Sequence, residues 1–298
     1  MKFGLVGTGY WARVTHGAVL ADHPGVELAG VWGRDPQKAA EVAAELGTVP
    51  YPDFGDLLGQ CDAVSFAVAP DVQGRLGIEA ARAGKHLLLD KPLCMSVDDA
   101  DQLVAEVERS RVASVVFFTL RFSQAGRDWV TAARDGDWQG GWARFLVLAL
   151  TPDSPYSGSL WRRERGAIWD VGPHALSVLI GGLGPIVTVA ATGGEGDLVH
   201  LVLRHASGAT STATLTLAAP KAAINVEMAL WGPKGVTMLP RDSSDPKIAF
   251  RAALGDLLHN VESGEVEHPC DVHFGADVVR VLADAEAQAA RSRSLPAR

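Results

Sequence analysis

The chain has 298 residues, 47% of them hydrophobic and 21% charged, which is the composition of a soluble globular protein with enough apolar residues for two domains. Lys and Arg total 27 and Asp and Glu total 35, so the formal net charge is −8. Such a surface repels phosphate backbones, and the short cationic run at residues 162–165 is interrupted by Glu164. We therefore expect no nucleic-acid partner.

The three cysteines are far apart in the sequence and form no CxxC pair. They are Cys61, Cys94 and Cys270. This spacing predicts neither a disulfide framework nor a metal site, and it is typical of a reducing compartment. The first ten residues read as a strand and a glycine turn rather than a signal peptide, and no apolar stretch reaches the roughly 18 residues of a membrane span. We expect a cytoplasmic protein with no membrane partner.

The first 120 residues alternate strand-like and helix-like patterns, which is typical of parallel βαβ units. The expected strands are Phe3–Val6, Val26–Trp32, a short strand at Tyr51, Asp62–Ala69, His86–Leu89 and Val112–Leu120. Asp35 followed by Pro36 predicts a helix start, with Asp35 as the N-cap residue. Six strands with intervening helices predict an α/β fold, a doubly wound Rossmann-type domain over residues 1–120.

From residue 121 to 298, strands follow strands, and this predicts an α+β domain with a mostly antiparallel sheet. The expected strands are Ala143–Leu150, Ile186–Thr192, Leu198–Arg204, Thr210–Leu217 and Ile224–Trp231. Helices are expected over Asp170–Ile180, about Ala249–Val261 and Val272–Ala290.

A glycine-rich turn follows the first strand. It consists of Gly7, Thr8, Gly9, Tyr10, Trp11 and Ala12, a G-x-G-x-x-A pattern. The first glycine permits a tight turn, the second lets a pyrophosphate approach the backbone, and Ala12 keeps the helix close to the sheet. Its position between a strand and a helix favours a dinucleotide-binding site over a purely structural turn.

The residues after the second strand distinguish NAD from NADP. Gly33 lies where an acid would bind the ribose 2′-hydroxyl of NAD, and Arg34 can pair with the 2′-phosphate of NADP. Asp35 is a rival ribose ligand, but the N-cap role explains it better. The sequence therefore favours NADP, with NAD as the alternative.

Two further segments carry ionisable side chains. Lys91, between Asp90 and Pro92, follows a parallel strand at the edge of the sheet where ligands bind in open α/β folds, although a surface lysine beside a loop proline is an alternative. Asp170 and His174 are four residues apart, and on one helix they would share a face. The alternative is a structural acid at a helix start and a buried histidine.

Taken together in this order, the glycine turn, Asp-Lys-Pro and Asp-x-Gly-x-His resemble the glucose–fructose oxidoreductase and inositol dehydrogenase family (Gfo/Idh/MocA). The resemblance extends over the whole chain, including Arg121-Phe122 and the turn at residues 136–140. It implies that Lys91, Asp170 and His174 surround a substrate hydroxyl, and that Pro70, Asp90 and Lys91 line the cofactor site.

The sequence departs from the family pattern at two positions. The family glutamate before the lysine is Asp90 here, and a histidine that often follows the proline after the fourth strand is Gly74. Trp161 and Arg162 resemble substrate-loop residues, and His16 lies either near the nicotinamide or at an ordinary helix position.

The resemblance implies an NAD(P)-dependent oxidoreductase that transfers a hydride between nicotinamide and a sugar, polyol or related cyclic hydroxy compound. Lys91 and His174 are the expected proton-transfer residues. Two alternatives remain open: a non-catalytic dinucleotide-binding sensor or scaffold, and a reductase of the dihydrodiol or tetrapyrrole type. The resemblance also implies a homo-oligomer formed through the C-terminal sheet.

Overall fold

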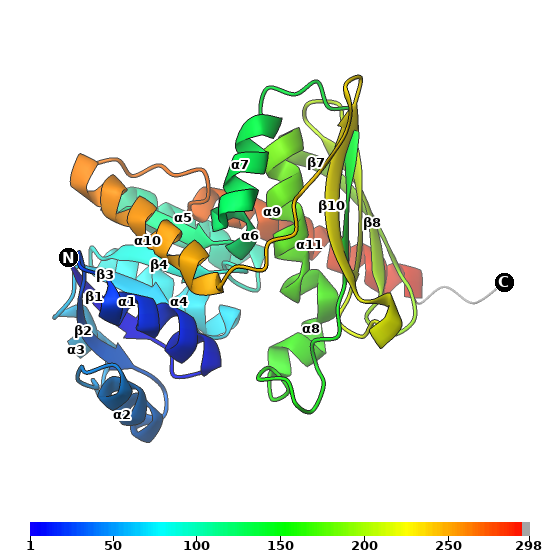
Figure 1. Ribbon diagram of the computed structural model, residues 1–298. Helices are drawn as coiled ribbons and strands as arrows, with labels where there is room; N and C mark the ends of the chain where they lie inside the picture. The colour runs from blue at the N-terminus through cyan, green and yellow to red at the C-terminus, as the bar shows by residue number, and fades with distance from the viewer. Residues whose placement is uncertain (294–298) are drawn as a thin grey trace. The chain divides into compact units, whose positions relative to one another are not determined.

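The computed structural model describes residues 1–293, which form two compact units (Figure 1). The first unit comprises Met1–Phe122 and Ser244–Val279, and the second comprises Ser123–Ser243 and residues 280–293. The division near residue 120 is close to the expected boundary, but the return of residues 244–279 to the first unit was not expected. This return is held by Phe250, whose ring lies 5.2 Å from that of Phe117.

The sheet of the first unit has five parallel strands in the order β2-β1-β3-β4-β5. The strands are β1 (Lys2–Val6), β2 (Glu27–Trp32), β3 (Ala63–Phe66), β4 (His86–Asp90) and β5 (Ser114–Phe117). The predicted Rossmann-type sheet is confirmed, but it has five strands and not six. The short strand predicted at Tyr51, third in chain order, is wrong. That segment makes only an isolated bridge between Val31 and Pro50, because prolines at 50 and 52 cannot donate to a strand ladder.

Helices connect these strands in the expected alternation. They are the π-helix η1 (Ala12–Gly17), α1 (Ala18–Asp22), α2 (Pro36–Glu45), α3 (Phe54–Leu58), α4 (Pro70–Arg82) and α5 (Val97–Ser110). Two more helices of this unit follow its last strand in the chain, α6 (Thr119–Phe122) and, in the returning segment, α10 (Pro246–Ser263). Asp35 caps α2 as predicted, since its side chain accepts hydrogen bonds from the backbone N–H groups of Gln37 and Lys38. Phe3, Leu5 and Phe66 are fully buried, as expected for a parallel sheet covered on both faces.

The second unit contains a six-stranded sheet in the order β11-β10-β6-β9-β8-β7. The strands are β6 (Gly140–Leu146), β7 (Ile186–Gly193), β8 (Val199–His205), β9 (Thr210–Thr216), β10 (Asn225–Gly232) and β11 (Gly235–Met238). Neighbouring strands are antiparallel except for β6 and β9. The mostly antiparallel sheet is therefore confirmed, although β11 was not predicted.

The second unit also contains three helices between residues 124 and 183, two of which carry Asp170 and His174. They are α7 (Gln124–Ala133), α8 (Leu160–Asp170) and α9 (Gly172–Leu183), and a 3-10 turn, η2, follows at Lys221–Ala223. α9 packs against β6 and β9 (Figure 1). The last helix, α11 (Val272–Arg293), contributes its first part to the first unit and its second part here.

The helix predicted over Asp170–Ile180 is confirmed for most of its length, but it begins two residues later. Asp170 is the last residue of α8, and α9 begins at Gly172. Pro173, in the first turn of α9, has no backbone N–H to continue the hydrogen-bond ladder of a longer helix. His174 therefore lies in the first turn of a new helix.

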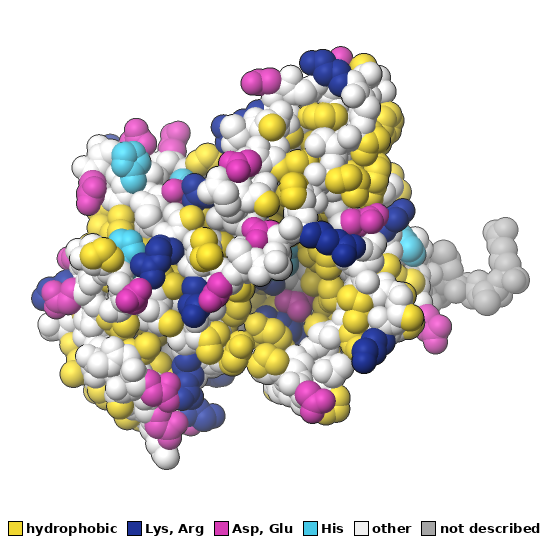
Figure 2. Space-filling model, viewed as in Figure 1, with side chains coloured by type: hydrophobic (Ala, Val, Ile, Leu, Met, Phe, Trp, Pro, Cys, Tyr) yellow, Lys and Arg dark blue, Asp and Glu magenta, His cyan; other side chains and the backbone are white. Residues whose placement is uncertain are grey.

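Charged residues of both signs are interspersed on the face of the molecule in Figure 2, where no extended basic patch is visible. Within residues 1–293, no helix has both the length and the apolar character needed to cross a membrane.

Candidate active site

The glycine-rich turn lies where β1 ends and η1 begins. Gly7 has a φ of +133°, and a Cβ atom on it would lie 2.4 Å from the carbonyl oxygen of Ala67, so only glycine fits. Around Gly9, by contrast, an added Cβ would meet no atom within 4 Å. Ala12 is fully buried against the sheet. A turn that is tight at its first glycine and open at its second fits the pyrophosphate of a dinucleotide.

The end of β2 offers a cation and no side-chain carboxylate at position 33. A Cβ on buried Gly33 would lie 2.5 Å from Cγ2 of Thr8, so a larger residue there would require the Thr8 side chain to move. Arg34 is exposed and makes no hydrogen bond or ion pair with any residue in the described range 1–293. Asp35 is engaged as the cap of α2. The side chain available at this position is therefore that of Arg34.

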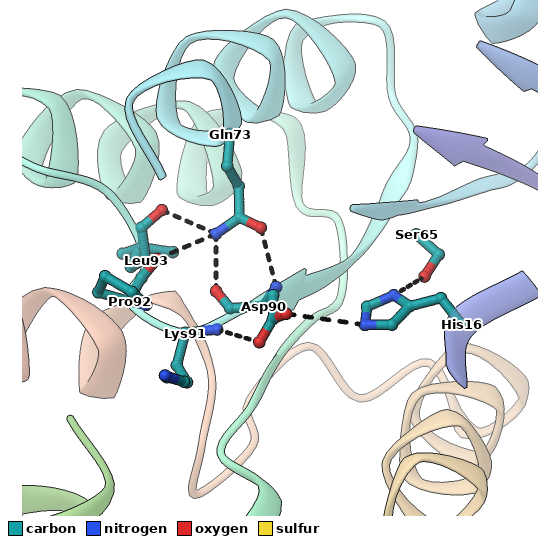
Figure 3. A network of polar contacts seen from close by, with 7 residues as sticks. All are labelled: His16, Ser65, Gln73, Asp90, Lys91, Pro92 and Leu93. Atoms are coloured by element: carbon teal, nitrogen blue, oxygen red, sulfur yellow. Dashed lines mark hydrogen bonds and ion pairs between the residues drawn. The ribbon is translucent and has the colours of Figure 1, made fainter. Parts of the chain in front are cut away.

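One glutamine side chain fixes the turn that carries Lys91 (Figure 3). Nε2 of Gln73, from α4, donates to the carbonyl oxygens of Asp90 (2.7 Å), Pro92 (3.2 Å) and Leu93 (3.0 Å). Its Oε1 accepts from the backbone N–H of Asp90 at 2.9 Å. Gln73 is only 1% exposed, so water does not compete for these bonds. The backbone around Lys91 is therefore firmly held.

The Asp90 side chain is part of the same turn. Its Oδ1 accepts a hydrogen bond from the backbone N–H of Lys91 at 2.7 Å. In Figure 3 the side chain of Lys91 points away from this carboxylate, from the carboxyl end of β4. Lys91 thus directly follows the carboxyl end of β4, and its contact with a ligand stays a prediction.

His16 lies inside the first unit, beside this turn. Its Nδ1 is 2.9 Å from Oγ of Ser65, and its Nε2 is 3.9 Å from Oδ2 of Asp90. The ring packs on Phe250 at a centroid distance of 4.1 Å and is fully buried. Burial lowers the pKa of His16 to about 3, so the imidazole is uncharged at neutral pH.

The other predicted residues of this region are structural neighbours of the turn. Pro70 is buried at the start of α4. A Cβ on Gly74 would lie 2.8 Å from Cβ of Cys94, so the histidine common in the family has no room here. Burial raises the pKa of the Cys94 thiol to about 12, which makes it a packing group rather than a nucleophile.

Asp170 and Arg162 form an ion pair in the second unit. Nε of Arg162 is 3.1 Å from Oδ1 of Asp170, and the Asp170 residue is 8% exposed. The guanidinium of Arg162 also lies over the rings of Tyr156 and Trp161, 4.5 Å and 4.4 Å from their centroids. These rings restrict where the cation can move, and so fix it against Asp170.

The end of α8 that carries Asp170 and the start of α9 that carries His174 are held by contacts with other elements. Glu286 on α11 accepts from Nε1 of Trp169 at 2.9 Å and pairs with Arg165 at 3.0 Å. The ring of His174 stacks on that of Phe145 at a centroid distance of 6.1 Å. Asp170 and His174 are thus both in the second unit, whereas the glycine-rich turn and Lys91 are in the first. Their convergence on one substrate stays a prediction.

Comparison with known proteins agrees with this fold. Residues 1–118 match the family GFO_IDH_MocA, described as an oxidoreductase family with an NAD-binding Rossmann fold. UDP-N-acetylglucosamine 3-dehydrogenase of Acidithiobacillus ferrooxidans is 31% identical over 116 residues, which cover 39% of this chain and 36% of that protein. D-apiose dehydrogenase of Paraburkholderia graminis is 28% identical over 235 residues, covering 74% and 62%. The chain thus spans less than two thirds of the length of either relative.

A solved structure resembles the chain over almost its whole length. Levoglucosan dehydrogenase, in complex with NADH and L-sorbose, superposes with a TM-score of 0.86 and covers 98% of this chain and 97% of its own. The two sequences are 17% identical, so this likeness establishes the shared fold.

Acidification is expected to destabilise the fold through His16. In the unfolded chain a histidine has a pKa of about 6.5, whereas burial lowers that of folded His16 to about 3. The unfolded state therefore binds the extra proton between these values, and stability is lost as the pH falls through this range. At about 1.4 kcal/mol per pKa unit, the loss is on the order of a few kcal/mol.

The measurement is urea unfolding of the wild type and of His16→Leu at several pH values in this range. Because other groups also titrate, the quantity of interest is the difference between the two curves. The wild-type free energy of unfolding should fall more steeply toward acid than that of the variant. Parallel curves would contradict the burial of an uncharged His16.

Proposed function

Because this chain belongs, through its residues 1–118, to the Gfo/Idh/MocA oxidoreductase family, we propose that it transfers a hydride between a nicotinamide cofactor and a sugar, polyol or related cyclic hydroxy compound. The observation that carries this proposal is the turn of Lys91, which Gln73 holds in place. This turn follows β4, and the glycine-rich turn follows β1 of the same parallel sheet. The two relatives named above are dehydrogenases of sugars or nucleotide sugars, which supports this substrate class.

The proposed roles follow from the chemistry of each side chain. The nicotinamide supplies or accepts the hydride when bound. The backbone of the glycine-rich turn would hold the pyrophosphate. Lys91 would give a proton to the substrate oxygen during reduction and take it up during oxidation, and His174 is the second candidate for this transfer. Asp170, held by Arg162, would orient the substrate hydroxyl.

The direct experiment is a turnover screen over sugars, polyols and nucleotide sugars, with NAD and NADP and in both directions, followed by nicotinamide absorbance. Turnover of at least one compound of this class is the expected result. Tight cofactor binding without any turnover would instead favour the non-catalytic sensor or scaffold.

We further propose that NADP(H) binds more tightly than NAD(H), since Arg34 is exposed and Gly33 has no carboxylate to bind the ribose 2′-hydroxyl of NAD. Arg34→Ala should weaken NADPH binding by about 1.5–3 kcal/mol, the usual value of a hydrogen bond to a charged group, and leave NADH binding unchanged. Arg82→Ala is the control, because Arg82 is an exposed arginine at the opposite end of α4 from Pro70. Fluorescence titration with both reduced cofactors measures the effect, and equal or tighter NADH binding by the wild type contradicts it.

Lys91→Ala should reduce kcat by roughly 10²–10⁴-fold, the usual contribution of a general acid–base group, with little change in the cofactor Kd. Lys85→Ala is a matched control because Lys85 precedes the same strand at its amino end and binds the carbonyl of Cys61. Asp170→Asn and His174→Ala should also slow turnover. The relative loss in His174→Ala and Lys91→Ala shows which residue is the main proton donor.

Two results would refute this assignment. If Lys91→Ala weakened cofactor binding but left kcat intact, Lys91 would be a binding residue only. If Asp170→Asn and His174→Ala both kept the wild-type kcat and KM, these residues would belong to the structure of α8 and α9 and not to the site.

We also propose that two copies associate through the outer face of the second sheet. The strand register places Val202, Trp231, Val236 and Met238 on one face. They are 56%, 39%, 60% and 44% exposed; Trp231, Val236 and Met238 lie together on β10 and β11, and Val202 lies three strands away on β8. Light scattering should give the mass of a dimer or larger assembly, and Val202→Glu with Trp231→Glu should lower it. Ile248→Glu on α10 is the control, and a monomeric wild type would contradict the proposal.

A further inference from the structure

His16 is a fully buried polar side chain for which the proposed reaction has no use. It lies on the π-helix η1, whose wide turns are rare and frequent at functional sites. Phe117 and Phe250 cover its ring, with centroids 6.2 Å and 4.1 Å away. Within residues 1–293, its polar contacts are with the hydroxyl of Ser65 and the carboxylate of Asp90. A buried polar group with such defined neighbours calls for a specific role.

The two neighbours select one tautomer of the imidazole. A neutral histidine carries its proton on a single ring nitrogen. A proton on Nε2 would point toward Oδ2 of Asp90, 3.9 Å away, while Nδ1 accepts a hydrogen bond from Ser65 at 2.9 Å. The opposite tautomer would direct a lone pair at a carboxylate, which is unfavourable where little water screens the charge. The geometry therefore favours the Nε2–H form.

This tautomer acts on the turn of Lys91 through Asp90. The two carboxylate oxygens of Asp90 face different groups: Oδ1 accepts from the backbone N–H of Lys91 at 2.7 Å, and Oδ2 faces His16 (Figure 3). At 3.9 Å the second contact is an attraction between a charge and a dipole rather than a hydrogen bond. It opposes rotation of the carboxylate away from Lys91.

We propose that His16 is a positioning residue for Lys91. Its uncharged imidazole, set in the Nε2–H form by Ser65, holds the Asp90 carboxylate in the orientation that fixes the Lys91 backbone. The consequence for turnover rests on the proposed function, because it requires that Lys91 take part in the reaction. The effect on the order of the Lys91 turn does not depend on the proposed function.

A matched pair of amide variants tests this role. In His16→Gln the amide reaches the position of the imidazole Nε2 and keeps a donor toward Asp90, whereas in His16→Asn it reaches only that of Nδ1. We expect His16→Asn to lower kcat by roughly 10–100-fold, the scale of a small misplacement of a reacting group, and to accelerate hydrogen exchange of the Lys91 amide. His16→Gln should restore both, and the cofactor Kd should be the same in all three proteins.

The outcome can also overturn the proposal. Equal losses of kcat in both variants, or an unchanged Lys91 amide exchange rate in His16→Asn, would show that His16 only fills space. If both variants fail to fold, the nitrogen NMR spectrum of the wild-type imidazole decides instead, and a proton on Nδ1 contradicts the proposal. If the wild type turns over no sugar or polyol, the proposed function fails, while the amide exchange and the imidazole spectrum still test the positioning role.

Discussion

The side-chain amide of Gln73 binds four backbone groups in the turn after β4, and the arrangement of the candidate site in the first unit depends on this interaction. A loop that leaves a parallel strand has no ladder partners of its own, and its buried carbonyl groups require donors from elsewhere. Gln73 supplies them from the first turn of α4, a helix that begins at Pro70 and therefore has a fixed direction of entry. The position of Lys91 is thus determined by a neighbouring helix as well as by its own strand.

The two compact units fix their ionisable residues by different means. In the first, buried neutral groups such as Gln73 and His16 surround the turn, so orientation is achieved without additional charge. In the second, Asp170 is held by a guanidinium that lies against aromatic rings, and α8 is tied to α11 through Glu286. A paired carboxylate retains its charge more readily than an isolated one in a partly buried site.

The features that the sequence predicted well are those with local signals. Strands β1 and β4 are apolar runs, Asp35 caps a helix, and Gly7 is required by its own backbone angle. Two of the differences from the predictions lie at prolines: no strand forms at Tyr51, and the helix expected from Asp170 begins at Gly172.

The contacts of Gln73 and of Glu286, which is 117 residues from Trp169, join distant segments and leave no periodic pattern to detect. Gln73 lies between Val72 and Gly74, with Asp71 and Arg75 next to them, so its sequence context gives no sign of this role. The close packing of Gly33 against Thr8 also couples two positions that are 25 residues apart in the sequence. A side chain at position 33 requires that the branched side chain of Thr8 move or be replaced by a smaller one. A change of residue at the end of β2 is therefore expected to be accompanied by an adjustment in the glycine-rich turn.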